Sequence, residues 1–317
     1  MNFDAADPFL IVVCGILGLV IGSFLNVVAY RVPRDESIVA PRSRCPKCET
    51  SLTALDMVPV LSWLALRGKC RHCGAGVSVE YAIVEALTGV LFAITAWRLG
   101  YVWELPAYLV AVAGLVALST IDVHTKRLPK KVFYPVTLAT GALLAAAAVA
   151  DRDWMSARDA FACGVVAFLF FFMLNFIYPR GLGFGDVRLS FLLGMLLGYQ
   201  RPIYVFFGLM LGFVAGAIGG LLLIVGSRFA NAEQKAGMKT AIPFGPWLAA
   251  GCFVGMLWGE PITDVVYPEF DSDPVPVMIV VDTVPGSVPS PTTTVATSGS
   301  SAPVTVVAPT SSTITTP

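Results

Sequence analysis

Charged side chains are scarce in this chain of 317 residues: Asp, Glu, Lys and Arg together make up 13% of it. Soluble domains carry about 25% charged residues, so this chain has roughly half the usual share. Hydrophobic residues make up 56% of it. This shortage of charge excludes an ordinary soluble protein and predicts an integral membrane protein in a lipid bilayer. The first ten residues contain no Lys or Arg, so they lack the basic region of a cleavable signal peptide, and we expect the first span to be retained.

Apolar runs long enough to cross a bilayer recur through the first 260 residues. They predict an all-α, polytopic helix bundle of about eight spans, near residues 8–30, 80–98, 103–121, 132–150, 159–178, 187–200, 203–225 and 243–259. The sixth run is short, so seven spans remain an alternative.

Basic residues are almost missing from one side of this predicted bundle. Of the 21 Lys and Arg, 17 fall in the segments 31–79, 122–131, 179–188 and 226–242, and four fall on the other side. Cytoplasmic loops are enriched in Lys and Arg, so we expect these four segments to face the cytoplasm and both termini to lie outside. The sequence therefore predicts a multi-pass protein of the inner (plasma) membrane, and no nucleic-acid partner is expected.

Composition divides the chain into three parts. Residues 1–100 hold the first span, a polar cytoplasmic loop and the second span, and residues 101–259 form the hydrophobic bundle. Residues 260–317 contain no Lys or Arg and are rich in Pro, Ser, Thr and Val, which predicts a disordered tail. Within this tail, Val275–Val284 could form a strand, although no partner strand is evident.

Two Cys-x-x-Cys pairs lie in the cytoplasmic loop, 21 residues apart. Four cysteines with this spacing predict a structural, tetrahedral zinc site with no open position for catalysis. Two disulfides or four free thiols are the alternatives, and a reducing cytoplasm disfavours the disulfides. Gly74 permits a tight turn after the second pair, and His72 is expected to be a bystander. The four ligands are Cys45, Cys48, Cys70 and Cys73.

Acidic residues at the cytoplasmic ends of spans are few: Glu85, Asp122 and Asp186. Asp122 ends the third predicted span and Asp186 begins the sixth, so both carboxylates lie at the same membrane depth on different helices. A pair of this kind can share one proton, with one carboxylate activating water and the other protonating a carbonyl oxygen. Either residue alone could instead face water; Asp186 could merely cap the sixth span, and Asp122 could belong to a charged loop before Pro129 restarts the next helix.

Two glycine-bearing segments adjoin these acids. Gly183 and Gly185 precede Asp186, and their small size predicts room for an extended peptide substrate. The stretch "TAIPFGPWLAAG" (Thr240–Gly251) places two prolines around Phe-Gly at the entry to the last span. It is either a functional break in the helix or a plain turn from loop to helix.

Several motifs, in order along residues 18–258, resemble the prepilin peptidases, the type IV leader peptidases with a GxGD motif. The stretch "GSFLNVVAYRVP" (Gly22–Pro33) resembles the family's N-terminal signature, and the four-cysteine loop resembles its cysteine-rich cytoplasmic domain. The stretch "DVHTKRLP" resembles the family's first aspartate motif, and "GLGFGDVRL" resembles its GxGD motif. The stretch "IPFGPWLAAG" resembles the family's motif in the last span.

The resemblance implies an aspartic endopeptidase that cuts the basic leader from prepilins or pseudopilins at the cytoplasmic membrane face. Asp122 and Asp186 would be its catalytic residues. The enzyme would act in type IV pilus assembly or in protein secretion. Many members also methylate the new N-terminus with S-adenosylmethionine. Arg188, Glu80 and the segment "TALDMVP" (Thr53–Pro59) depart from the usual pattern, and the last two bear on methylation.

Three other functions remain to be separated from this one. The chain could be a peptidase without methyltransferase activity, a transporter or channel with proton-relaying acids, or a scaffold that binds partners through its cysteine loop. Paired discontinuous spans, which mark many transporters, are not evident in the sequence. The sequence leaves the oligomeric state, the particular substrate and the role of the tail open.

Overall fold

A computed structural model describes residues 7–40, 43–45, 47–179, 183–229 and 244–266. The chain divides into two compact units, residues 1–270 and 271–317. The second unit, with the expected strand at 275–284 and most of the expected disordered tail, lies outside the described residues. The three-part division by composition stays a prediction.

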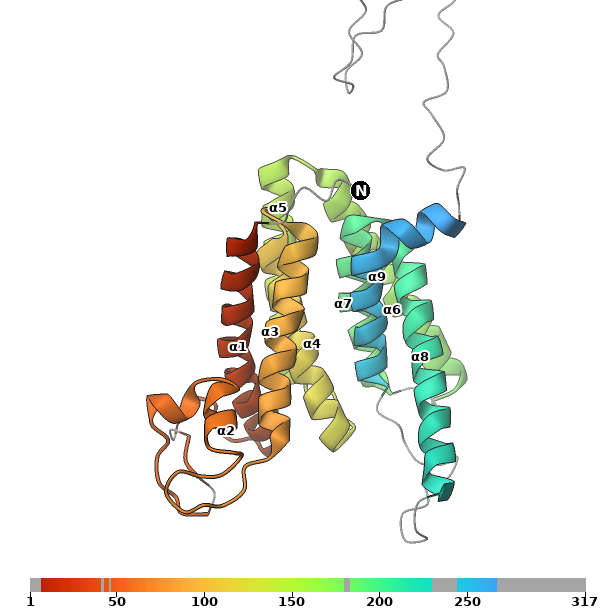
Figure 1. The fold of residues 1–317 in the computed structure, drawn as a ribbon. Coiled ribbons are helices and arrows are strands. Elements are labelled where there is room, and N and C mark those ends of the chain that lie inside the picture. Colours follow the sequence, from red (N-terminus) through yellow and green to blue (C-terminus); the bar gives the residue numbers. More distant parts are fainter. Residues whose placement is uncertain (1–6, 41–42, 46, 180–182, 230–243, 267–317) are drawn as a thin grey trace, which may run out of the picture. The chain divides into compact units, whose positions relative to one another are not determined.

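Helices are the only regular elements in the described part of the chain, and two isolated bridges, Arg44–Ser51 and Lys69–Gly76, lie in the loop between α1 and α3. Figure 1 shows the long helices running up and down beside one another. In chain order the elements are α1 (Pro8–Arg31), η1 (Val32–Arg34), η2 (Ala54–Met57), α2 (Leu61–Ala65), α3 (Val79–Leu99), α4 (Leu105–Thr125), α5 (Lys130–Asp151), α6 (Trp154–Ile177), α7 (Phe184–Gln200), α8 (Pro202–Phe229) and α9 (Gly245–Val266).

Eight long helices, α1 and α3–α9, coincide with the eight expected spans. Six of them are long and apolar enough to cross a membrane, and α7 and α9 are not among these six. α7 has only 17 residues, as its short apolar run predicts. α9 continues to Val266 through a non-helical Trp258, so the expected tail boundary at residue 260 lies inside a helix. The all-α membrane bundle is confirmed.

Small residues let pairs of helices approach closely. A Cβ on Gly18 of α1 would lie 2.7 Å from the Thr88 carbonyl oxygen of α3, and one on Gly194 of α7 would lie 2.7 Å from the Cys163 carbonyl oxygen of α6. The hydrophobic effect does not drive helices together inside a lipid bilayer, so close van der Waals contact of this kind stabilises the pairs. Each pair therefore depends on its glycine.

The core centres on α4 and α7, the two helices that carry Asp122 and Asp186. Tyr108 of α4 is fully buried, and its hydroxyl donates a 2.7 Å hydrogen bond to the Leu196 carbonyl oxygen of α7. The two helices run in opposite directions, so the end of α4 and the start of α7 meet at one end of the bundle (Figure 1). This arrangement brings the two aspartates to the same level.

Candidate active site and metal site

A pocket of about 800 Å³ opens at this end of the bundle. Its walls come from η1 and the residue that follows it, from the end of α4 with the turn into α5, and from the start of α7, segments that are far apart in the sequence. All three were expected to lie on one side of the membrane. Its lining includes Asp35, Asp122, Lys126, Leu128, Gly183, Gly185, Asp186 and Arg188.

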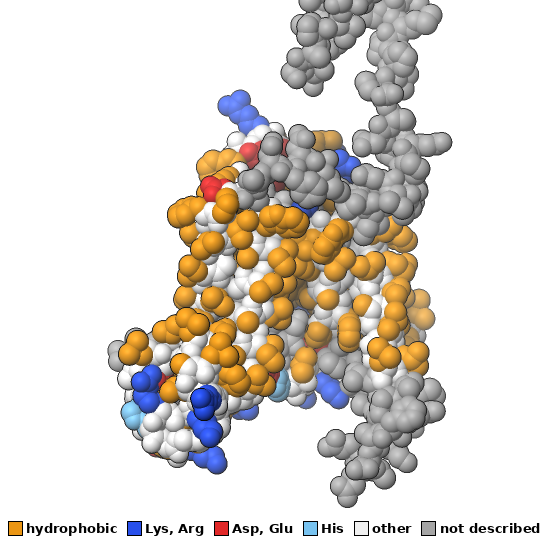
Figure 2. All heavy atoms as spheres, viewed as in Figure 1, with side chains coloured by type: hydrophobic (Ala, Val, Ile, Leu, Met, Phe, Trp, Pro, Cys, Tyr) orange, Lys and Arg blue, Asp and Glu red, His pale blue; other side chains and the backbone are white. Residues whose placement is uncertain are grey.

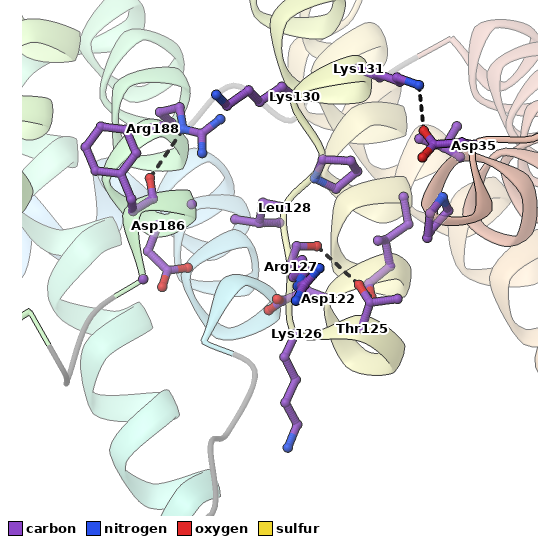
Figure 3. Close-up of a pocket in the computed structure, with 17 residues that line it drawn as sticks. Asp35, Asp122, Thr125, Lys126, Arg127, Leu128, Lys130, Lys131, Asp186 and Arg188 are labelled. Carbon is purple, nitrogen blue, oxygen red and sulfur yellow. Dashed lines mark hydrogen bonds and ion pairs between the residues drawn. The ribbon is translucent and has the colours of Figure 1, made fainter.

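Asp122 and Asp186 both line this pocket, from α4 and α7 respectively. Figure 3 shows the two carboxylates pointing toward the same space between these helices. Asp122 is 6% exposed, and Asp186 is half-buried in the first turn of α7. The structure thus brings together the two acids that the sequence singled out by depth alone.

Gly245 is a site residue that the sequence analysis did not single out. Its backbone N–H, at the start of α9, donates a 3.2 Å hydrogen bond to Oδ2 of Asp122. A Cβ at this position would lie 3.0 Å from the same oxygen, so a larger residue would disturb the contact. The available signal was the Phe-Gly-Pro run, which equally suited a plain turn between loop and helix.

Gly183 and Gly185 lie where the sequence placed them, along the pocket. A Cβ on Gly185 would lie 3.0 Å from Cδ1 of Leu128, and one on Gly183 would lie 3.4 Å from Oδ2 of Asp186. Gly185 therefore allows the α4–α5 turn to approach α7 closely. The substrate-region role of both glycines stays a prediction.

Arg188 was noted in the sequence only as a departure from the family's usual pattern. It follows Asp186 by two residues and lines the same pocket. Its Nη1 is buried without a hydrogen-bond partner among the described residues, while its Nε makes one long bond of 3.4 Å to the Phe184 carbonyl oxygen (Figure 3). A guanidinium has five N–H donors, so Arg188, which lines the same pocket as Asp186, has donors that no described residue accepts.

Glu80, the second departure, contacts the helix that bears Asp122. Its Oε1 lies 3.1 Å from Nε2 of His124, whose Nδ1 lies 2.8 Å from the Thr120 carbonyl oxygen. This contact joins the start of α3, directly after the cysteine loop, to the last turn of α4.

The four cysteines predicted as metal ligands come together in the loop between α1 and α3. Their sulfurs all lie within 4.8 Å of one another, and Cys45 Sγ lies 3.8 Å from Cys73 Sγ. A tetrahedral zinc with bonds of about 2.3 Å places its sulfurs about 3.8 Å apart, so the cluster could hold such a metal. All four are free thiols rather than disulfides, and His72 is not part of the cluster.

The two Cys-x-x-Cys pairs have matching backbone turns. The Glu49 N–H donates to the Cys45 carbonyl oxygen at 2.9 Å, and the Gly74 N–H donates to the Cys70 carbonyl oxygen at 3.0 Å. Both turn residues have positive φ, 56° for Glu49 and 70° for Gly74. The predicted tight turn at Gly74 is confirmed, and the first pair makes it with a residue that lacks glycine's freedom.

Asp56 ties the middle of the loop to the second cysteine pair. It accepts a 2.6 Å hydrogen bond from the Thr53 hydroxyl and a 2.7 Å bond from Nε of Arg71. These contacts lower the pKa of the Asp56 carboxyl to about 2, with the Thr53 hydroxyl as the largest cause. In the cysteine pairs, hydrogen bonding by Thr50 lowers the pKa of the Cys48 thiol to about 6, whereas burial and the neighbouring thiols raise the pKa of the Cys73 thiol to about 11.

The bundle and its pocket define an integral membrane protein with two carboxylates facing each other at one end and a four-cysteine loop beside them. Residues 16–99 match the bacterial peptidase A24 N-terminal domain, and residues 109–226 match the type IV leader peptidase family. No solved structure matches the chain.

Curated relatives match over most of the chain, and each of three is named prepilin leader peptidase/N-methyltransferase. The Stutzerimonas stutzeri protein is 34% identical over 83% of this chain and 96% of its own length. The Myxococcus xanthus protein is 41% identical over 74% of this chain and 67% of its own length. The Bacillus subtilis protein is 33% identical over 78% of this chain and 94% of its own length. The chain belongs to the type IV leader peptidase family, which confirms the resemblance seen in the sequence.

Proposed function

We propose that this chain is a membrane-embedded aspartic endopeptidase that removes the basic leader from type IV prepilins or pseudopilins. The observation that carries the proposal is the convergence of Asp122 and Asp186 on one pocket from two different helices. Family membership supports the substrate class, since the relatives are named for prepilin leaders.

The two carboxylates would share one proton across the pocket. The ionised member removes a proton from water as it attacks the scissile carbonyl, and the protonated member donates to the carbonyl oxygen. The Gly245 amide holds Asp122 in one orientation through its 3.2 Å bond. The shared proton belongs to the pair, so neither residue is assigned a fixed role as acid or base.

The test is to co-express a prepilin with the wild type, Asp122→Asn and Asp186→Asn, and to follow leader removal by gel shift. Both substitutions keep the side-chain shape, and each should abolish processing. Asp153→Asn is the matched control, because Asp153 caps α6 by accepting from the Met155 and Ser156 N–H groups. Processing by either pocket variant would refute the catalytic dyad and favour the alternative functions, a transporter or a scaffold.

The four cysteines are proposed to hold a structural zinc. The 3.8 Å separation of the Cys45 and Cys73 sulfurs supports this metal, and four thiolates leave no open coordination position. Metal analysis of the purified protein should give one zinc in the wild type and none in Cys45→Ser. Equal zinc content in both proteins would exclude the site.

Methylation of the new N-terminus with S-adenosylmethionine is proposed as a second activity. The relatives' names support it, whereas a peptidase without this activity is the alternative. Mass spectrometry of the mature prepilin decides between them, because methylation replaces one N–H hydrogen with a methyl group and so adds the mass of one CH2. The same measurement on Glu80→Lys shows whether the departure at this position affects the transfer.

We further propose that the protein lies in the inner (plasma) membrane with the pocket facing the cytoplasm and the tail outside. Figure 2 shows a band of hydrophobic side chains, with Lys and Arg side chains gathered below it at the end where the pocket lies. This distribution fits the enrichment of cations in cytoplasmic loops. Reporter fusions after Gly76 and after Arg152 should report cytoplasmic and outer locations respectively.

A further inference from the structure

The cysteine loop carries an apolar segment that the metal site and the active site do not use. Residues 55–64, named here the apolar segment, cover all of η2 except its first residue and all of α2 except its last. Leu55, Leu61 and Leu64 are 69%, 64% and 58% exposed, and Met57 and Val58 are exposed beside them. Five large apolar side chains exposed within ten residues indicate an interaction surface rather than a face toward water.

The short helix α2 has two distinct sides. Trp63 faces the rest of the loop, because its Nε1 donates a 3.1 Å hydrogen bond to the Val77 carbonyl oxygen and its ring packs on Gly68. Leu61 and Leu64, three residues apart, share one face of a helix and remain exposed. The inner side therefore belongs to the loop, and the leucine side lacks a cover among the described residues.

A backbone contact sets the depth of the apolar segment. The Val60 N–H donates a 2.7 Å hydrogen bond to Oε2 of Glu85, which lies six residues into α3, about 9 Å along the helix at 1.5 Å per residue. Glu85 also faces Gly22 of α1, where a Cβ would lie 2.8 Å from the Glu85 Cα. Gly22 lies nine residues before the end of α1, about 13 Å along it.

The apolar segment is therefore attached beside the spanning helices, not beyond their ends. Figure 1 shows the loop with α2 alongside the lower parts of α1 and α3. At this level the helices also expose apolar side chains, Phe24 on α1 and Ile83 on α3. The exposed leucines thus continue the lipid-facing surface of two spans.

The same loop carries exposed basic side chains. Arg44, Lys47, Arg67 and Lys69 are exposed, while the acid Asp56 is already paired with Arg71. Cations next to an apolar face are typical of segments that lie in the interface of anionic membranes.

We propose that the apolar segment lies in the membrane interface, with Leu55, Leu61 and Leu64 among the lipids and the flanking cations at anionic phospholipid headgroups. The four-cysteine cluster is thereby held at the membrane surface at two places, through the spans and through this segment. The inference does not depend on the peptidase activity.

Photo-crosslinking in purified, full-length protein tests the proposal. The probe is p-benzoylphenylalanine at Leu61 or at Leu64, in nanodiscs of phosphatidylcholine and phosphatidylglycerol, with adducts identified by mass spectrometry. Ile83 is the lipid-facing reference position and Glu49, an exposed acid in the first cysteine turn, is the polar control. We expect phospholipid adducts at Leu61 and Leu64 comparable to Ile83 and at least about tenfold above Glu49.

A second labelling guards against disturbance by the bulky probe. Photo-leucine, which is close to leucine in size, is incorporated throughout the chain, and the tryptic peptide that ends at Arg67 is searched for lipid adducts. Crosslinks from this peptide to a second copy of the chain, or to added prepilin, would overturn the proposal in favour of a protein partner. Adduct levels equal to the Glu49 control would overturn it in favour of exposure to water.

Discussion

The backbone N–H of Gly245 in α9 donates a 3.2 Å hydrogen bond to Oδ2 of Asp122 in α4, across 123 residues of sequence. The contact makes the start of α9 part of the candidate active site. It accounts for the glycine at this position, since a Cβ there would lie 3.0 Å from the same oxygen.

Gly245→Ala should lower leader processing by at least about tenfold, because the new Cβ would lie 3.0 Å from Asp122 Oδ2 and must displace the carboxylate or α9. The measurement is kcat/KM with a purified prepilin. Gly141→Ala is the matched control: its Cβ would meet only the end of the Met195 side chain, with Sδ at 3.6 Å and Cε at 3.8 Å, so activity should hold. Equal activity of both variants would show that the Gly245 contact is dispensable.

Arg188→Met should raise the thermal stability of the protein and weaken its activity. The change removes a guanidinium whose Nη1 is buried without a partner among the described residues, and such burial is costly. If the free donors bind substrate, KM should rise by roughly tenfold to a hundredfold, since hydrogen bonds to charged groups contribute about 1.5–3 kcal/mol. The control is Arg158→Met, which removes an exposed partner of Asp159. An unchanged KM would show that Arg188 has no part in substrate binding.

Glu49→Gly and Gly74→Ala should change the metal loop in opposite directions. Both positions have positive φ, which costs a residue with a Cβ about 1 kcal/mol. Nothing lies within 4 Å of a Cβ on Gly74, so the cost there is conformational alone. Competition with a zinc chelator should show tighter metal retention in Glu49→Gly and weaker retention in Gly74→Ala. A shift in the same direction for both would contradict the matching turns.

The Asp56–Arg71 contact should make the cysteine loop sensitive to acid. The folded loop lowers the pKa of Asp56 to about 2, so its stabilisation is fully present above the ordinary range near pH 4 and is lost as the pH falls through about 2. Pepsin, which is active in acid, should cleave the loop of Asp56→Asn faster than that of the wild type at pH 4. Metal release affects both proteins alike, since both keep four cysteines. A difference that persists undiminished at pH 2 would contradict the assignment.

The span pattern was predictable from the sequence because it depends on composition along each segment. Runs of apolar residues predicted the eight long helices, and their ends differ from the expected ones by a few residues at most places. α9 is the exception, since Val266 lies seven residues past the expected end. The polar residues after Trp258 carry too little hydropathy to mark a continuing helix.

The site was predictable only where residues identify themselves by type and spacing. Cys45, Cys48, Cys70 and Cys73 did so through two short repeats, and the structure brings their sulfurs together. Asp122 and Asp186 did so because each lies at the predicted cytoplasmic end of its span. Their catalytic and metal-binding roles stay predictions.

What the sequence by itself determined is therefore the membrane class, the helices and the residue types at the two candidate sites, because these follow from local composition and short spacings. Only the tertiary structure decided which helices are neighbours. The approach of Gly245 to Asp122 and the bond from Val60 to Glu85 join elements far apart in the chain. Hydropathy cannot encode such contacts, because every spanning helix presents much the same apolar surface, and shape and hydrogen bonding alone select the pairs.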